Sequence, residues 1–284
     1  MSLVINTNVS SLSAQRNLHN RTSEVRSSHE KLASGYRINK ASDDASGLSI
    51  SETLQTQIRG NQKAVQTAQD GVNTLQIAEG ALNVITDHIQ RIREITVQAA
   101  NDTNTSAERI AIKLEVQSRL DDINRIAQTT RSSNIYLLDG SKSSYILQIG
   151  GNASAAQNTI DIADALATST VEALSLTNTV SVGAGGAFET NTSCRNFLDT
   201  IDRAIQRVQS RRAKLGAFQN RLESAVENIS ITVESLKSTN SRIKDLNISA
   251  ETAEFTKNQI LQQSTISILS QANSSPSQVL QLLQ

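Results

Sequence analysis

Residues suited to metal binding or nucleophilic chemistry are few and scattered in this sequence. The single cysteine, Cys194, is near none of the three histidines, which are themselves far apart: His19, His29 and His88. His29-Glu30 begins like a zinc-protease signature, but Ala33 occupies the position of the second histidine ligand. A histidine on a solvated helix face is the better interpretation, and we expect no metal, no cofactor and no enzymatic activity.

Two adjacent acids, Asp43 and Asp44, could form a catalytic carboxylate pair. They directly precede a periodic apolar run through Leu48, Leu54 and Ile58. Carboxylates placed there accept hydrogen bonds from free amides at a helix N-terminus and complement its dipole. Helix capping is therefore favoured over catalysis.

Two further features could hold phosphate or nucleic acid. The glycine-rich stretch 183–186 precedes no strand-to-helix pattern, and the phosphate-loop motif is absent from the sequence. Arg211, Arg212 and Lys214 make a basic spot, but acidic residues surround it and aromatic residues for base stacking are missing. A flexible tip and a solvated or ion-paired helix face are the simpler interpretations.

The composition favours long aliphatic helices over a compact enzyme. The 284 residues are 37% hydrophobic but only 2% aromatic, and Lys plus Arg equals Asp plus Glu at 27 each. No overall field therefore attracts nucleic acid or an anionic membrane. One cysteine excludes an internal disulfide, no apolar run could span a bilayer, and residues 1–30 lack a signal-peptide profile. These rules alone predict a cytoplasmic protein.

One uninterrupted heptad stripe organises the chain. Between Leu198 and Leu246 every seventh residue is apolar: Ile201, Val208, Leu215, Leu222, Ile229, Leu236 and Ile243. Such a stripe predicts a coiled-coil helix about 70 Å long. The companion position three residues later is mixed and mostly small or polar, with Arg211 and Phe218 among its members, so we expect several helices of this chain to share the contact.

A second long periodic segment supplies a partner for this stripe. Its apolar steps of four and three begin at Leu54, slip in phase between Leu75 and Ala78, and continue to Ala99. A further stripe on the same helix predicts more than one helical neighbour: Ile77, Ala81, Val84, His88 and Ile95.

Shorter elements are predicted between the two long helices. Thr105 and Glu108 fit a capping box that starts a helix folding back on the first. Its expected apolar positions are Ile110, Leu114, Leu120, Ile123 and Ala127. Alternation over 145–149 and 160–162 predicts a small β-hairpin, and 163–196 is expected to be a surface tip.

Both ends of the chain are too polar to fold alone. Residues 2–30 carry apolar residues at helical spacing, diluted by Ser, Asn, Thr and Gln, and Gly35 suits a helix C-terminal cap. Past Leu246 the pattern thins in the same way. Each helix buries too little apolar surface to offset its ordering entropy, so we expect both to fold only against a neighbour. The predicted fold class is mainly α, a long antiparallel helical bundle or coiled coil with a small β-hairpin region at the tip.

Several blocks of the sequence closely resemble bacterial flagellin. They cover both halves of the chain in the family's order and are Leu32–Ser51, Gln90–Glu94, Arg212–Glu223, Ser241–Asp245, Gln271–Asn273 and Val279–Leu283. One departure is Ser132-Ser133, where the family usually has Phe-Asn before the Leu-Leu-Asp-Gly turn of 137–140.

This resemblance implies a structural subunit of the flagellar filament used for motility. Such subunits leave the cell through the flagellar type III export channel without a cleaved signal peptide, so the resemblance replaces the cytoplasmic prediction with an extracellular one. It implies a terminal coiled-coil domain of residues 1–44 plus 245–284 in the inner core of the filament. Residues 45–244 would form a helical shell domain with a small β region and a variable tip at about 140–196. The chain thus resembles a minimal flagellin without large outer domains.

The resemblance also implies binding residues. Contacts with other copies are expected at Leu12, Leu18, Leu32, Arg91, Glu94, Ile95, Leu261, Leu269, Leu280 and Leu283. A host Toll-like receptor recognises many flagellins through positions that match Arg91, Ile95 and Glu115. Contacts between subunits are nevertheless the favoured interpretation of these residues. Four residues of the last helix resemble the segment that an export chaperone and cytosolic sensors bind: Val279, Leu280, Leu282 and Leu283. The alternative is that these residues pack inside the filament. Flagellar cap and hook-junction proteins are further expected partners; nucleic acid and membranes are not.

Two other functions remain open at this point. A hook-filament junction protein of the same apparatus shares terminal heptads, but would cap existing filaments instead of forming long ones. A soluble coiled-coil interaction module would be a stable oligomer with ordered ends.

Overall fold

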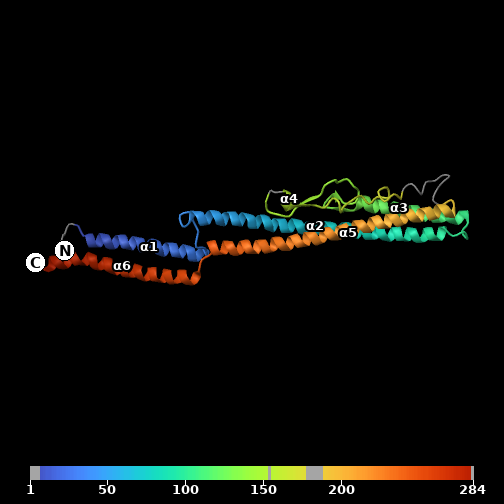
Figure 1. The fold of residues 1–284 in the computed structure, drawn as a ribbon. Coiled ribbons are helices and arrows are strands. Elements are labelled where there is room, and N and C mark those ends of the chain that lie inside the picture. Colours follow the sequence, from blue (N-terminus) through green and yellow to red (C-terminus); the bar gives the residue numbers. More distant parts are fainter. Residues whose placement is uncertain (1–6, 153–154, 177–187, 283–284) are drawn as a thin grey trace. The chain divides into compact units, whose positions relative to one another are not determined.

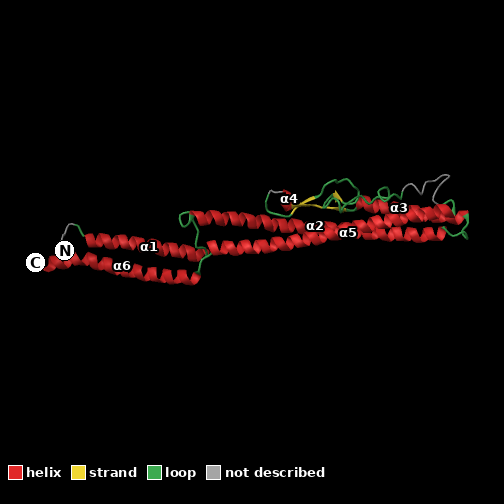
Figure 2. Cartoon of the chain, viewed as in Figure 1, coloured by secondary structure: helices red, strands yellow, loops and turns green. Residues whose placement is uncertain are grey.

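The computed structural model describes residues 7–152, 155–176 and 188–282, and it confirms the mainly α fold class (Figures 1 and 2). The elements in chain order are α1 (Val9–Ser34), α2 (Ala45–Ala99), α3 (Ser106–Thr129), β1 (Arg131–Ser132), β2 (Ile135–Tyr136), β3 (Ile146–Gln148), α4 (Ala155–Asn158), β4 (Thr159–Asp161), α5 (Asn191–Lys244) and α6 (Ile248–Leu282).

The chain forms two compact units. The terminal unit comprises Met1–Thr56 and Ser235–Gln284, and the central unit comprises Gln57–Glu234. Helices α2 and α5 contribute residues to both units. The division expected from the resemblance, 1–44 plus 245–284 against 45–244, concerns layers of a polymer and stays a prediction.

In the terminal unit, α1 and α6 lie side by side and antiparallel (Figure 1). Asn8 near the start of α1 donates through Nδ2 to the carbonyl of Ala272 at 2.8 Å, and Gln262 donates to the Thr22 hydroxyl at 3.0 Å. The helix α1 ends at Gly35, whose φ of 73° is the left-handed conformation that glycine adopts without steric cost. The predicted cap is confirmed.

The connections on either side of this pair are tied together by the backbone. The N–H of Leu246 donates to the carbonyl of Gly35 at 3.0 Å, and the N–H of Arg37 donates to the carbonyl of Lys244 at 2.7 Å. The Lys244 ammonium also lies 4.6 Å from the centroid of the Tyr36 ring, a cation–π contact. The chain leaving α1 is therefore joined to the chain entering α6.

The two adjacent acids stabilise the start of α2. An Asp44 carboxylate oxygen accepts from the N–H of Gly47 at 2.8 Å, as expected for a helix cap. Asp43 instead accepts from the amides of Asn39 and Lys40, both at 3.0 Å, and these hydrogen bonds, Asn39 first, lower the pKa of its carboxyl. The capping interpretation is confirmed for Asp44, while Asp43 closes the preceding turn.

The core of the central unit follows the predicted phase slip of α2. Val72, Leu75 and Ala78 are all buried, although their two successive steps of three break the regular alternation of four and three in a heptad. The α5 stripe faces them, with its first four members completely buried: Ile201, Val208, Leu215 and Leu222. Ile229, the next member, is only half-buried.

Two predicted apolar faces are wrong in part. On α2, Ile77 and Val84 are 44% and 45% exposed, because α3 and α5 contact α2 on other faces. On α3, Ile110 and Leu114 are exposed. The buried face of α3 consists of Val116, Leu120, Ile123 and Ala127, so the prediction holds only for its second half. The capping box of Thr105 and Glu108 is confirmed.

The small strands form two hairpins. In the predicted one, β3 pairs antiparallel with β4 and places Leu147 opposite Ile160. The other, β1 with β2, was not expected from the sequence. Its turn places Ser133 and Asn134 at φ 47° and 78°, the two positive φ angles that a tight two-residue hairpin requires.

The segment after β4 corrects another prediction. Residues 163–196 were expected to form a surface tip, but apolar side chains between 165 and 176 pack into the core: Ala165, Leu166, Val171, Leu174 and Leu176. Their spacing is irregular, so periodicity could not reveal them. Residues 177–187 lie outside the described residues.

Candidate assembly interface

The α1–α6 pair buries little for its length. Its fully buried residues with described side chains are Ala14 and Ser28 on α1 and Asn258 on α6. Six large apolar side chains of the pair are instead at least half exposed: Val9, Leu12, Ile248, Ile260, Ile266 and Ile268. A helix pair of this kind gains little from its own packing and presents apolar surface to solvent.

The sequence-predicted contact residues of this pair differ in exposure. Leu12 is 51% exposed and lies on the outer surface. Leu18, Leu32, Leu261 and Leu269 are half-buried. Val279, Leu280 and Leu282 belong to the last turns of α6, where the structure describes the helix but not the side chains, and Leu283 lies outside the described residues.

The second predicted cluster lies where α2 meets α3. An Arg91 Nη atom is 2.9 Å from a Glu94 carboxylate oxygen, and Arg91 Nε is 3.8 Å from Glu115. Glu115 in turn pairs with Arg119 at 3.0 Å. The hydrogen bond to Glu94, followed by the charge of Glu115, raises the pKa of Arg91. Arg91, Glu94 and Glu115 are thus brought together as an exposed charged network.

Ile95, predicted for the same cluster, is placed differently. It is 3% exposed and belongs to the apolar core between α2 and its neighbours. Its side chain therefore supports the surface on which Arg91 and Glu94 lie but does not form part of it.

Sequence reasoning missed the apolar part of this surface. Ile110 and Leu114, 60% and 68% exposed, lie one helical turn apart on α3, and Leu114 directly precedes Glu115 in the sequence. Exposed apolar residues beside a charged network are typical of protein contact surfaces. The signal was present in the sequence, but these residues were assigned to the buried face.

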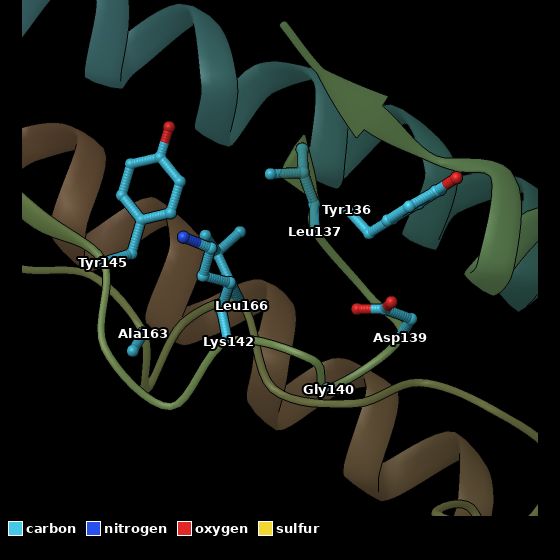
Figure 3. Close-up of a pocket in the computed structure, with 8 residues that line it drawn as sticks. All are labelled: Tyr136, Leu137, Asp139, Gly140, Lys142, Tyr145, Ala163 and Leu166. Atoms are coloured by element: carbon cyan, nitrogen blue, oxygen red, sulfur yellow. The ribbon is translucent and has the colours of Figure 1, made fainter. Parts of the chain in front are cut away.

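The described part of the chain offers little for chemistry. No group of three or more His, Cys, Asp or Glu side chains there could hold a metal ion. The small cavity of Figure 3, between the Leu137–Gly140 turn, Tyr145 and Leu166, has a volume of about 10 Å³, room for one water molecule. Among the described helices, none is long and apolar enough to cross a membrane.

Comparison with known proteins decides the family. The model of the bacterial flagellin N-terminal helical region matches residues 5–143, and that of the C-terminal helical region matches residues 198–283. This chain belongs to the bacterial flagellin family. Flagellin FlaB1 of Treponema pallidum is 38% identical over 291 residues, covering 99% of this chain and all of that protein. The flagellin of Bacillus subtilis is 39% identical over 302 residues, covering 98% and 99%.

A solved structure shares the fold of this flagellin. A protein described as flagellar hook-associated, from Vibrio parahaemolyticus, covers 72% of this chain and all of its own with a TM-score of 0.53, at 15% identity. That likeness concerns the fold alone. The full-length relatives include the flagellar filament 33 kDa core protein of Treponema phagedenis, 36% identical over 99% of this chain. The hook-junction alternative is not better supported than the filament.

Membership of this family establishes the role of the chain in the assembled filament. The chain is a structural subunit that polymerises with copies of itself into the extracellular flagellar filament.

Proposed function

We propose that the α1–α6 pair is the element through which copies of this flagellin hold one another in the filament. The observation that supports this proposal is the imbalance of the pair: among its described side chains, three are buried and six large apolar ones are at least half exposed. Each isoleucine among them is 50–61% exposed, so covering the rest of one is worth about 1–2 kcal/mol. Neighbouring copies that cover these side chains can therefore add substantial stabilisation to the pair.

The weakness of the pair in one copy is part of the mechanism. Residues 2–39 and 247–284 become rigid only when neighbouring copies cover them, so that folding of the ends and assembly occur together. This coupling makes polymerisation cooperative. It also keeps the ends unfolded enough for export through a narrow channel, without a cleaved signal peptide.

The exposed network of Arg91, Glu94 and Glu115 forms a second contact surface in this proposal. It is supported by its neighbours Ile110 and Leu114, whose exposed side chains would be covered by another copy. The same charged residues, with Ile95 beneath them, are the proposed recognition surface for a host Toll-like receptor. Because two different patches meet, the contacts are heterologous and generate an open helix instead of a closed ring.

Further partners are proposed for the last helix. Val279, Leu280, Leu282 and Leu283 would be bound by an export chaperone before assembly, and by cytosolic sensors in a host. In the filament they would pack against other subunits, including cap and hook-junction proteins at its two ends. The chain is proposed to act only by assembly and not as an enzyme.

Seeded polymerisation of matched variants tests the proposal. Ile260→Ser and Ile231→Ser remove side chains that are both 61% exposed, the first on α6 and the second on α5 outside both proposed surfaces. We expect electron microscopy to show long filaments from the Ile231→Ser protein and few or none from Ile260→Ser. Equal filament yield from both variants would contradict the assigned interface.

A further inference from the structure

Three cations of α5 face the segment that follows β4. They lie at steps of four and three along the helix: Arg207, Arg211 and Lys214. Lys214 is neutralised, because its ammonium lies 2.9 Å from both carboxylate oxygens of Asp164. The two arginines differ from Lys214 in the groups that they contact.

Among the described residues, the two arginines donate hydrogen bonds only to neutral groups. Arg207 donates through Nη1 to the Ser175 hydroxyl at 2.7 Å and to the Ala173 carbonyl at 3.4 Å. Arg211 donates through Nη1 to the Ser169 hydroxyl at 2.9 Å. Neither guanidinium forms an ion pair with a carboxylate of residues 7–152, 155–176 or 188–282. The sequence of residues 177–187, which lie outside the described residues, contains no Asp or Glu.

The absence of a nearby negative charge destabilises the charged form of Arg211. Its side chain is half-buried, and burial, followed by the charge of Arg207, lowers the pKa of its guanidinium. An arginine nevertheless stays protonated at any ordinary pH. Only a negative charge nearby, and not loss of a proton, would therefore relieve the repulsion between the two groups.

Within residues 7–152, 155–176 and 188–282, guanidinium donors remain available for such a charge. Each arginine donates to a serine hydroxyl through one guanidinium nitrogen, and neither side chain has a nitrogen that is buried without a partner there. The Ser175 hydroxyl accepts from Arg207 and keeps its own hydrogen available. The segment that carries these serines is fixed, because the N–H of Ser169 donates to the Leu138 carbonyl at 2.8 Å and Asn124 accepts from the N–H of Val171 at 2.9 Å.

We propose that Arg207, Arg211 and the Ser175 hydroxyl form a binding site for a small tetrahedral oxyanion such as inorganic phosphate or sulfate. The planar forks of two guanidinium groups match the oxygens of such an anion, and hydrogen bonds between charged partners are stronger than those to neutral hydroxyls. Two cations without aromatic neighbours form a site for one small anion and not for a nucleic-acid strand. The bound anion would join the 169–175 segment to α5.

Titration of the full chain as a monomer, with inorganic phosphate at constant ionic strength, tests the site directly. We expect saturable binding by calorimetry and a rise in the thermal midpoint of the central unit that follows the bound fraction. Arg207→Gln and Arg211→Gln should each weaken binding at least tenfold. Arg207→Lys keeps the positive charge but loses the planar guanidinium group. Its affinity for phosphate should therefore lie between that of the unmodified chain and that of Arg207→Gln. Arg221→Gln, an exposed arginine on the same helix, should bind like the unmodified chain.

Phosphate also stabilises folded proteins by exclusion from their surfaces, so the background must be measured. The double variant Arg207→Gln, Arg211→Gln gives that background, with circular dichroism confirming that it is folded. Should it fail to fold, Arg207→Gln alone, which alters an exposed side chain, provides the same comparison. The site is refuted if phosphate shifts the double variant as much as the unmodified chain, or if Arg221→Gln weakens binding equally. Because the readout uses monomers, its failure is separate from failure of the assembly proposal.

Discussion

Asn61 of α2 accepts a hydrogen bond through its side-chain oxygen from the backbone N–H of Gly151, at 3.0 Å. Gly60 directly precedes it, and a Cβ at that position would lie 3.3 Å from the Cα of Gly151. The chain that follows β3 is therefore packed on the backbone of α2, and the close approach explains a glycine in the middle of a long helix.

Alanine at this glycine and at Gly80, also within α2, should have different effects. Gly80→Ala places a Cβ where nothing lies within 4 Å, so we expect the free energy of unfolding to rise by about 1 kcal/mol through helix propensity. Gly60→Ala has the same gain in propensity but pushes against the backbone of Gly151, so its net effect should be zero or destabilising. Urea unfolding of both variants measures the difference, and an equal gain would contradict the close packing.

The α5 stripe should contribute unequally along its length. Leu215 is fully buried, so Leu215→Ala leaves a cavity and should cost about 2–5 kcal/mol. Ile229 is half-buried, so Ile229→Ala should cost roughly 1 kcal/mol. Chemical unfolding followed by circular dichroism distinguishes the two. Similar losses would mean that the stripe is buried throughout.

The carboxylate of Asp161 makes the central unit sensitive to acid. It accepts hydrogen bonds from the amides of Ala163 and Tyr145, both at 2.9 Å, and these bonds, Ala163 first, lower its pKa in the folded state. Because the folded pKa lies below the unfolded one, the stabilisation is complete above the unfolded pKa and is lost as pH falls through the folded pKa. We expect this loss below about pH 4.

Thermal unfolding from pH 7 down to pH 2 checks this prediction. Asp161→Asn should be less stable at neutral pH and should lose less on acidification. Asp70→Asn, an exposed aspartate on α2, provides the matched control and should keep the unmodified profile. An unchanged acid profile in Asp161→Asn would show that the hydrogen bonds do not distinguish the two protonation states.

Asn258 weakens the α1–α6 pair in the single copy. It is 3% exposed, and its side-chain oxygen has no partner among the described residues. Burying an unsatisfied polar atom costs about 1–3 kcal/mol, so Asn258→Leu should strengthen the pair by a similar amount. Limited proteolysis of monomers reports this as slower cleavage within α1 and α6. Gln259→Leu alters the exposed neighbour and should leave the cleavage rate unchanged; slower cleavage in both variants would indicate a general effect of leucine.

Periodicity predicted the elements whose own side chains determine burial. The phase slip at Leu75 and Ala78 and the α5 stripe were found because buried positions in long helices repeat regularly. Periodicity failed at Ile110 and Leu114, because apolar spacing shows that a face exists but not which turns a neighbour covers. The β1–β2 turn was missed because Ser133 and Asn134 adopt positive φ without a glycine.

The candidate contact residues came from family resemblance more than from physical pattern. Nothing in the spacing of Leu280 or Leu283 distinguishes filament packing from chaperone binding. Arg91 and Glu115 lie on different helices, so their proximity became clear only once α3 was seen folded against α2. The burial of Leu166 and Leu174 likewise depends on the irregular segment after β4, which local sequence does not determine.

Hydrogen–deuterium exchange on the free monomer and on the filament tests whether neighbouring copies make α1 and α6 rigid. We expect rapid exchange of α1 and α6 amides in the monomer and strong protection of the same amides in the filament. Amides of α2 and α5 near Leu82 and Leu215 should be protected in both states, since that core is complete within one copy. Equal protection of α1 and α6 in monomer and filament would contradict the claim that neighbouring copies make the two terminal helices rigid.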